Sequence, residues 1–346
     1  MYEVGILGNY GGRTLSYDGQ TIKTKIVSFE IERQLGINAV LKKNTHGGFF
    51  FFLKLPFVIC TLLLFCKNIL IFPAQRGIKY IVPLLVIGNK FFKRKLHYIV
   101  IGGWLPEFVE SRSFLTSCLK EIDWIYVETE IMKKRLLIQG FQNVCVMHNF
   151  KILPILDKKN LCTTYDIPYK FCTFSRVMKE KGIEDAINAI LMLNENASSV
   201  ICTLDIYGKV DELQKDWFNS LMKSAPKEIV YKGCIPFDKS VDTLKNYYGL
   251  LFPTYYNGEG FAGTLLDAFA AGVPVIASDW HYNAEIVDDG KTGLVCRIQD
   301  VNDLMKKIYY SINQKKDWLE YKRNCIDKAN EFVTSKVIKV LLSKLG

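Results

Sequence analysis

Two carboxylates and a set of glycines lie together between Asn257 and Pro274. Glu259 sits in a glycine-rich turn, and Asp267 follows eight residues later on a short apolar segment that ends at Gly272. Glycine lets a backbone approach a ligand closely, and the first N–H groups of a helix attract an anion. Carboxylates accept hydrogen bonds from hydroxyl groups. This combination predicts binding of a diphosphate that carries hydroxyl-rich groups, such as a sugar or a ribose.

The apolar segment is expected to form a short helix with one buried face. Thr264 is placed to cap its start, and Gly272 before Pro274 is placed to stop it. The free N–H groups of residues 262–265 would then face the anion. Glycine spacing alone leaves a simpler interpretation open, namely the loop and capped helix of an α/β domain with two solvated acids.

The stretch 259–278, followed by 283–287 and 290–295, resembles the E-x7-E region of family-4 retaining glycosyltransferases of GT-B fold. The second acid is Asp267, where that family usually has Glu. The resemblance implies that Glu259 holds hydroxyls of the donor sugar and that Asp267 holds the nucleotide ribose. It also implies donor contacts for the residues between them, which are Gly260, Phe261, Ala262, Gly263, Thr264 and Leu265.

A second match to this family lies at residues 174–183. In the family an Arg and a Lys at this spacing grip the donor diphosphate, and here they would be Arg176 and Lys181. A guanidinium and an ammonium can neutralise a pyrophosphate whose charge rises as the glycosidic bond breaks. Such a pair is by default solvated, but it stands about eighty residues before Glu259, as in the family. The resemblance therefore implies that Glu259, Arg176 and Lys181 are the catalytic residues.

The N-terminal half carries glycine-containing segments of lower specificity. After the first predicted strand, family members have a glycine loop near donor or acceptor. Gly11, Gly12 and Gly19 are therefore candidate donor contacts, and Arg13 is a candidate acceptor contact. A surface turn is the alternative for each of them. Lys23, in the following helix, can equally be a solvated charge.

A second N-terminal candidate segment is Gly102, Gly103 and Trp104. Many relatives have a histidine near the donor sugar in this region. Here the two glycines would let backbone groups line the acceptor side, and Trp104 would stack on an acceptor sugar or pack in the core. His97, at the start of the preceding strand, is expected to be a packed or edge residue rather than a catalytic one.

Composition is that of a globular protein with two domains. The 346 residues are 49% hydrophobic and 23% charged, with a formal net charge of +10. The ten cysteines show no C-x-x-C pair and the four histidines are dispersed, which predicts reduced core cysteines, a cytosolic protein and no metal site. No nucleic-acid motif is present, so the positive charge favours phosphorylated substrates and an anionic membrane surface.

The most hydrophobic segment is Phe49–Phe72. Its longest uncharged run, Leu55–Cys66, is too short to cross a bilayer core of about 30 Å. We rank a core helix with a following strand first, partial insertion into one leaflet second, and a true span last. Residues Met1–Gly8 contain an acid and are expected to form a first strand rather than an export signal.

Apolar runs alternate with helical patterns along the chain, which predicts an α/β fold with parallel sheets. We expect two Rossmann-like doubly wound domains in the GT-B arrangement, with an interdomain cleft and a C-terminal crossover helix. The expected domains are an acceptor-side domain, 1–155, a donor domain, 156–330, and a C-terminal helix, 331–346. The expected strands are 2–7, 68–73, 98–102, 124–127 and 144–148, then 171–174, 202–207, 229–231, 249–252, 273–277 and 293–296.

The resemblance implies a retaining hexosyltransferase that needs no metal or other cofactor. A UDP-sugar is the first expectation for its donor and GDP-mannose the second. The acceptor would be a saccharide or lipid-linked saccharide, in surface polysaccharide or glycoconjugate synthesis, in the cytoplasm or on the inner face of the cell membrane. Two alternatives stay open. One is a non-catalytic GT-B partner of a polysaccharide assembly complex, and the other is a nucleotide-cofactor enzyme, although its Gly-x-Gly-x-x-Gly pattern is missing.

Overall fold

The computed structural model describes residues 1–12 and 19–345 of the chain, which form two compact units. The first unit comprises residues 1–152 together with 333–346, and the second comprises residues 153–332. The C-terminal segment is thus part of the first unit, although it follows the second in the sequence.

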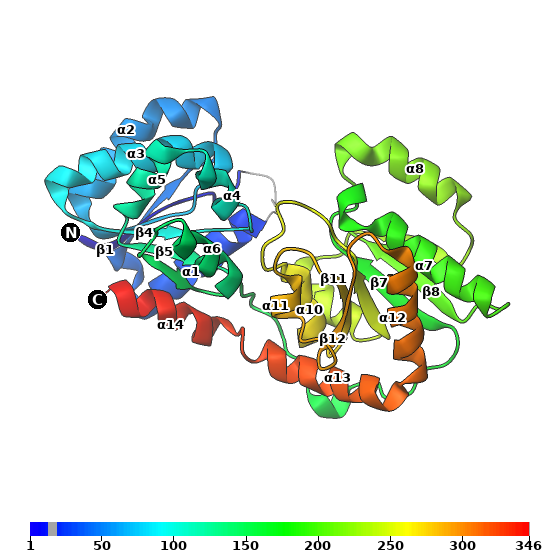
Figure 1. Ribbon diagram of the computed structural model, residues 1–346. Helices are drawn as coiled ribbons and strands as arrows, with labels where there is room; N and C mark the ends of the chain where they lie inside the picture. Colours follow the sequence, from blue (N-terminus) through cyan, green and yellow to red (C-terminus); the bar gives the residue numbers. More distant parts are fainter. Residues whose placement is uncertain (13–18, 346) are drawn as a thin grey trace. The chain divides into compact units, whose positions relative to one another are not determined.

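The first unit is built on a six-stranded parallel sheet with the order β2-β1-β3-β4-β5-β6. Helices α2, α3 and α5 lie on one side of this sheet in Figure 1, and α1 packs with α14. The elements are β1 Tyr2–Gly8, α1 Gly19–Leu35, β2 Val40–Asn44, α2 Phe49–Phe65, β3 Cys66–Ile71, α3 Gln75–Phe92, β4 Lys95–Ile99, α4 Leu105–Glu110, α5 Ser113–Lys120, β5 Trp124–Val127, α6 Glu130–Ile138, β6 Val144–Val146 and α14 Thr334–Leu345.

The second unit is also built on a six-stranded parallel sheet, with the order β12-β11-β10-β7-β8-β9. Helix α7 packs against α12, and α10 packs against α9 and α13. Its elements are β7 Tyr169–Phe174, α7 Ile183–Asn196, β8 Cys202–Tyr207, α8 Lys215–Ser224, β9 Ile229–Gly233, α9 Ser240–Leu244, β10 Gly249–Phe252, α10 Gly263–Ala270, β11 Val275–Ser278, α11 Asn283–Ile286, β12 Gly293–Cys296, α12 Val301–Asn313 and α13 Lys315–Ala329.

The α/β fold with two doubly wound sheets is confirmed. Apolar strands covered on both sides read as continuous hydrophobic runs, so most were visible in the sequence. Strand β2 was missed because it is a sheet edge with half-exposed or exposed lysines at positions 42 and 43. Residues 301–345 form three helices, which are interrupted at Gln314 and between residues 330 and 333.

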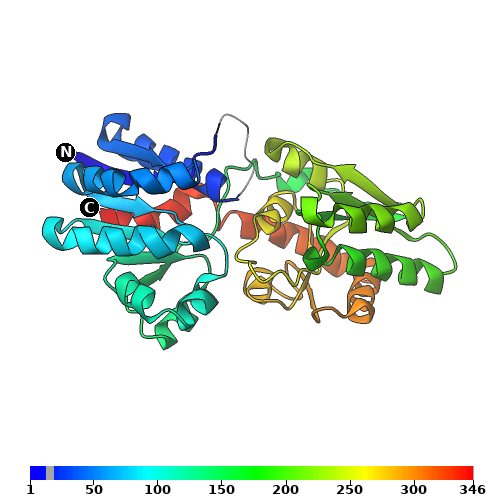
Figure 2. The same ribbon diagram turned by 90° about the horizontal axis from the view of Figure 1, so that it is seen from above.

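The C-terminal helix α14 completes the core of the first unit. Val337, Ile338 and Leu341 are buried among residues of β1, α1 and β3. The amide of Asn68 on β3 also donates to the carbonyl of Leu345 at 3.0 Å. Both views accordingly show α14, in red, beside the sheet of the first unit (Figures 1 and 2).

The segment Phe49–Phe72 forms helix α2 and strand β3, as ranked first. No helix in the described part of the chain is both long and apolar enough to cross a membrane. Six of the ten cysteines are buried, but Cys60 and Cys234 are exposed, so the expectation that the cysteines are core residues is wrong for these two.

His97 is a packed residue, as expected. Its side chain is fully buried and contacts the hydroxyl of Tyr126 at 2.9 Å and the amide oxygen of Asn68 at 3.2 Å. Burial lowers the pKa of His97 to about 4, so the imidazole is neutral near pH 7.

Candidate functional site

The candidate site of the second unit lies where strands β7 and β10 end. These neighbouring parallel strands lie at the point where the strand order of the sheet reverses. In open α/β sheets, ligands bind outside the carboxyl ends of the strands at such a point. The sequence-predicted residues Arg176 and Lys181 follow β7, while Glu259 follows β10.

The centre of the site is an ion pair between Lys181 and Glu259. The Lys181 ammonium lies 2.5 Å from Glu259 Oε2, and the two side chains are only 11% and 8% exposed. The hydroxyl of Thr254 lies 2.9 Å from the same carboxylate oxygen. The ammonium also lies 4.9 Å from the ring centroid of Tyr256. The pair is thus largely shielded from water, where electrostatic interactions are strong.

The turn that carries Lys181 is fixed by its backbone. Residues Lys179–Lys181 form a 3-10 turn, and Gly182 follows with a φ of +69° before α7 begins. A Cβ atom on Gly182 would lie 2.1 Å from the carbonyl oxygen of Pro253. Only glycine combines that φ with so close an approach. The Lys181 turn is therefore held directly against the segment after β10.

Further hydrogen bonds join this turn to the same segment. The Tyr255 N–H donates to the carbonyl of Glu180 at 2.8 Å, and the Thr254 hydroxyl lies 3.2 Å from that carbonyl oxygen. Gln214 accepts from the Lys179 N–H at 2.7 Å and donates to the Glu180 carboxylate at 2.9 Å. These contacts fix the position of Lys181 relative to Glu259.

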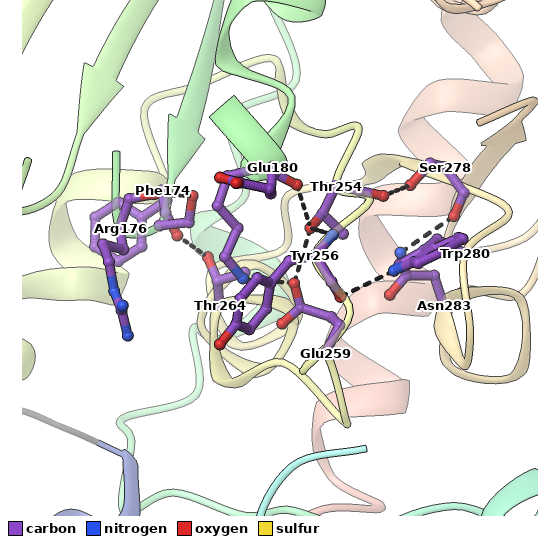
Figure 3. Close-up of polar contacts among 12 residues, drawn as sticks. Phe174, Arg176, Glu180, Thr254, Tyr256, Glu259, Thr264, Ser278, Trp280 and Asn283 are labelled. Carbon is purple, nitrogen blue, oxygen red and sulfur yellow. Dashed lines mark hydrogen bonds and ion pairs between the residues drawn. The ribbon is translucent and has the colours of Figure 1, made fainter. Parts of the chain in front are cut away.

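The last residue of β11 and the segment after it support the site from the other side (Figure 3). Ser278 donates to the carbonyl of Thr254, Trp280 donates to the carbonyl of Tyr256 at 2.9 Å, and Asn283 donates to the carbonyl of Ser278 at 3.1 Å. Sequence analysis did not single out these supporting residues. Their position in the sequence was the available signal, because polar residues at the carboxyl ends of neighbouring parallel strands lie close together.

Helix α10 begins beside the site, but its cap differs from the expected one. Ala262 is the N-cap, and Thr264 lies inside the first turn. The Thr264 hydroxyl donates instead to the carbonyl of Phe174 at the end of β7, at 2.5 Å. The expected cap role of Thr264 is therefore wrong, because a distant acceptor binds its hydroxyl. The helix ends as expected, with Gly272 at a φ of +64° and the Val273 N–H bonded to the Ala268 carbonyl at 2.9 Å.

The residues between the two carboxylates have different surroundings. The N–H of Leu265 donates to the Ala262 carbonyl at 3.1 Å. The expectation that this N–H is free is therefore wrong. Gly263 and Thr264 occupy the first two helical positions, whose N–H groups have no acceptor within a helix. Gly260 is buried, and the Phe261 ring packs edge-on against Phe332 with centroids 4.8 Å apart.

Asp267 is almost completely buried on α10. The Ser240 hydroxyl of α9 donates to its carboxylate at 2.9 Å. The carboxylate therefore joins α10 to α9 in this structure. Arg176 is instead exposed and lies 3.5 Å from the carboxylate of Asp211. In Figure 3 its side chain lies apart from Glu259, so the guanidinium remains accessible to a ligand.

The loop candidates of the first unit follow β1. Gly11 has a φ of +78°, and its carbonyl accepts from the Asn44 amide at 3.0 Å. A Cβ atom on Gly12 would lie 2.6 Å from the His46 ring, whereas Gly19 opens α1 with no atom near that position. Arg13 lies outside the described residues.

The second candidate segment of the first unit follows β4. Gly102 has a φ of +85°, and its N–H points to the carboxylate of Glu128 at 3.4 Å, while Gly103 directly precedes Trp104. The Trp104 indole donates to the Ile101 carbonyl at 2.8 Å and packs edge-on against the Phe108 ring. The Trp104 side chain is half-buried, so these contacts leave both the stacking and the packing interpretations open.

Glu128 also forms an ion pair that sequence analysis missed. The Lys23 ammonium lies 2.8 Å from its carboxylate, and both side chains are 3% exposed. The solvated interpretation of Lys23 is therefore wrong. The residues around Lys23 in α1 did not indicate Glu128 as its partner, because Glu128 follows β5 more than one hundred residues later in the sequence. The described residues include no group of three or more potential metal ligands.

Comparison with known proteins gives the family of the second unit. Residues 163–332 match the family described as Glycosyl transferases group 1. The second unit is therefore a domain of the glycosyl transferases group 1 family. The match includes Arg176, Lys181 and Glu259 and extends over nearly all of the second unit.

Similar sequences include two proteins that are described as glycosyltransferases. The GtfA subunit of the Streptococcus gordonii UDP-N-acetylglucosamine--peptide N-acetylglucosaminyltransferase is 28% identical over 229 residues, which is 63% of this chain and 43% of that protein. An uncharacterized glycosyltransferase of Methanocaldococcus jannaschii is 24% identical over 69% of this chain and 56% of its own length. The chain thus spans about half the length of these relatives.

Solved structures show that both units have the GT-B fold. HepE from Anabaena, in complex with UDP and glucose, has a TM-score of 0.74 at 13% identity and covers 100% of this chain and 99% of its own. Sucrose-phosphate synthase from Thermosynechococcus elongatus has a TM-score of 0.75 at 15% identity and covers 100% of this chain and 98% of its own. At these identities the likeness concerns the fold.

Proposed function

We propose that this group 1 glycosyltransferase is a retaining enzyme that moves a hexose from a UDP-sugar to a saccharide or lipid-linked saccharide. The proposal rests on the buried pair of Lys181 and Glu259 at the switch point of the second sheet, with Arg176 exposed on the segment that also follows β7. Removing a charged pair from water costs desolvation free energy. The binding of a charged, hydroxyl-rich donor is a function that needs both charges and accounts for their burial.

The proposed chemistry assigns a role to each charged group. Arg176, Lys181 and the first N–H groups of α10 would offset the charge that grows on the leaving diphosphate. Glu259 would accept hydrogen bonds from donor sugar hydroxyls, while its contact with Lys181 holds both groups in place. Attack of the acceptor from the side of the leaving group would let the departing phosphate take the proton. No protein nucleophile and no metal ion are assigned in this scheme.

Asp267 is the proposed ribose contact that the present geometry supports least. Its carboxylate is 1% exposed and bonded to Ser240. It reaches less far than the Glu of the family, so contact with a ribose hydroxyl requires that α9 and α10 separate locally or that Ser240 rotates. Gly260 to Thr264 on the same segment would contribute backbone contacts to the donor, whereas the Leu265 N–H is already bonded to the Ala262 carbonyl.

The choice of UDP follows the relatives. The S. gordonii protein is named for a UDP-N-acetylglucosamine donor, and HepE was solved with UDP and glucose. A guanosine nucleotide such as GDP-mannose is the second choice. The uracil and guanine rings differ in size, so a binding screen separates them.

We expect UDP to raise the unfolding temperature of the chain, while GDP and ADP raise it less. A ligand at 100 times its Kd stabilises a protein by about 2.7 kcal/mol. Arg176→Ala and Lys181→Ala should each reduce this shift, while Arg323→Ala on the exposed side of α13 should leave it unchanged. Differential scanning fluorimetry measures all of these combinations. If no nucleotide shifts the unfolding temperature, or if both variants keep the shift, the diphosphate assignment is wrong.

Turnover separates an active enzyme from a non-catalytic GT-B partner. Release of UDP from a bound UDP-sugar, in the presence of a saccharide acceptor, is the expected activity. Nuclear magnetic resonance of the product should show the anomeric configuration of the donor. Donor binding without turnover would favour the non-catalytic partner, and inversion would contradict a retaining mechanism.

Contact with an anionic membrane is the proposed route to a lipid-linked acceptor. Helix α2 carries an exposed stripe at helical spacing, formed by Phe50, Leu53, Phe57 and Leu64. Helix α3 packs against α2 and carries a second stripe, formed by Tyr80, Leu84, Ile87 and Phe91. We call these eight residues the α2–α3 apolar surface. Buried residues occupy the opposite side of both helices, so these stripes are not part of the core.

The charged residues within α2 and α3 have one sign. Neither helix contains an acidic residue, while α2 contains Lys54 and α3 contains Arg76, Lys79 and Lys90. Exposed apolar stripes rarely occur on monomeric proteins without an interaction partner. Large apolar groups next to basic residues are typical of surfaces that bind anionic lipid headgroups.

We expect the chain to sediment with phosphatidylglycerol-containing vesicles and to bind phosphatidylcholine vesicles much more weakly. Phe50→Ser and Phe57→Ser should each weaken binding by about tenfold or more, because a buried Phe contributes about 1.5–3 kcal/mol. Phe237→Ser is the matched control, because Phe237 is similarly exposed on the second unit. Equal binding by all three variants would show that the α2–α3 apolar surface is not the membrane contact.

A further inference from the structure

The second unit has a pocket at the amino ends of its central strands, and the candidate donor site lies at their carboxyl ends. Tyr169 begins β7 and Tyr248 directly precedes β10, so both lie at the amino ends of these strands. Arg176 and Glu259 follow the carboxyl ends of the same two strands. A six-residue strand spans about 17–20 Å, so the pocket is separate from the donor site.

The pocket has an exposed polar rim and a buried aromatic floor. Its volume is about 260 Å³, slightly below the roughly 300 Å³ at which pockets for drug-sized ligands begin. It therefore suits one ring rather than an extended molecule. Thr163, Thr164 and Lys315 form the exposed rim, Tyr165 and Leu319 form the half-buried walls, and Tyr169, Tyr248, Trp318 and Lys322 are buried.

Lys322 is the unusual member of this lining. Its side chain is 1% exposed, and its ammonium has no hydrogen-bond acceptor among the described residues. The nitrogen lies 5.3 Å from the ring centroid of Tyr165. Burial lowers the pKa of Lys322 to about 8, so the charged form still predominates at pH 7. An unpaired buried charge destabilises a protein, and it persists where a ligand supplies the missing partner.

Three other polar groups of the lining already have partners. The Trp318 indole donates to the Tyr248 carbonyl at 2.9 Å, and the Tyr248 hydroxyl donates to the Ser311 carbonyl at 2.5 Å. The Tyr165 hydroxyl donates to the Cys162 carbonyl at 3.1 Å. The pocket thus offers aromatic surface and one unused cationic donor. No carboxylate lines it, and Lys315 adds a second positive charge at the rim.

We propose that this pocket binds a single hexose-sized ring that carries a carboxylate or a phosphate. The anionic group would accept hydrogen bonds from Lys322, and the C–H faces of the ring would pack on the aromatic side chains. The rim threonines would contact ring hydroxyls. A free sugar phosphate and an acidic sugar unit of a polysaccharide both have this chemistry. The proposal does not depend on the donor site and holds whether or not the chain transfers a sugar.

Isothermal titration calorimetry of the full chain tests the proposal. Saturating UDP is present throughout, so that sugar phosphates cannot report on the donor site. Glucose 6-phosphate and glucuronate are titrated separately, with glucose and inorganic phosphate as partial ligands. We expect one of the two anionic sugars to bind at least about tenfold more tightly than glucose or phosphate alone. The preferred sugar identifies the source, phosphorylated or acidic.

Lys322→Met removes the charge and preserves the length of the side chain. It should weaken binding of the anionic sugar by at least about tenfold, whereas Lys316→Met, at an exposed position of α13, should not change it. The Met variant should also unfold at a temperature at least about 2 °C higher, since the unpaired charge is gone. The proposal is overturned if neither anionic sugar binds or if phosphate alone binds as tightly as the preferred anionic sugar. It is also overturned if the Lys322→Met variant binds that sugar with the affinity of the wild type.

Discussion

Replacing Lys181 by methionine is expected to lower the rate of sugar transfer by about 10²–10³-fold, the loss typical of one transition-state contact. The ammonium lies 2.5 Å from Glu259 and is largely buried, so water cannot replace it efficiently. The same substitution leaves the Glu259 carboxylate buried without its partner, which is expected to reduce stability by about 3–5 kcal/mol. Initial transfer rates and urea unfolding of the full chain measure the two effects.

A second substitution separates catalysis from stability. In the double variant Lys181→Met with Glu259→Gln, no unpaired charge remains, so much of the lost stability should return. The transfer rate should stay low, because both proposed donor contacts are gone. Lys179→Met, at an exposed position of the same turn, is the matched control and should retain the wild-type rate. If the double variant recovered activity together with stability, the pair would be structural only.

The replacement of Gly182 by alanine is expected to destabilise the second unit by roughly 2–5 kcal/mol. Gly182 has a φ of +69°, and its Cβ would lie 2.1 Å from the Pro253 carbonyl oxygen. Relief of this contact must move the backbone next to Lys181 away from the segment that leads to Glu259. The transfer rate of the folded variant should therefore fall as well. Urea unfolding and initial rates test both effects.

Gly233 provides the matched control for this substitution. It has a φ of +74° in the same unit, but no atom lies within 4 Å of the position of its Cβ. Gly233→Ala should therefore show only the backbone penalty of about 1–2 kcal/mol and a normal transfer rate. Equal losses of stability in the two variants would mean that contact with Pro253 does not fix the Lys181 turn.

Local patterns were sufficient for most strands of the second sheet. Gly249–Phe252 was predicted with its observed limits, because a buried parallel strand appears as an uninterrupted apolar run. Cys202–Tyr207 was also predicted with its observed limits, although Thr203 and Asp205 interrupt its apolar residues. The stop of α10 at Gly272 was predicted for a similar reason, since a left-handed residue at a helix end favours glycine. The edge strand β2 lacked such a pattern because its outer side is polar.

Partners distant in sequence were not predictable in this way. Thr264 has the residue type of a cap, but its hydroxyl found the carbonyl of Phe174, ninety residues earlier. Lys23 resembled a solvated helix charge, yet it is buried against Glu128. The burial of Lys322 was likewise not predictable, because the residue lies in a charged stretch of helix α13. In each case the burial of the side chain depends on which other element packs over it.

The sequence by itself determined the chemistry of the donor segment, namely its carboxylates, its cations and the glycines that shape the turns. These properties belong to residue types and local backbone conformation. Only the tertiary structure decided that Lys181 and Glu259 form one buried pair, that Asp267 bonds to α9, and that Lys322 faces an aromatic pocket. Such contacts follow from the order of strands in the sheet and the packing of helices on it, which depend on the whole unit rather than on any short stretch of the chain.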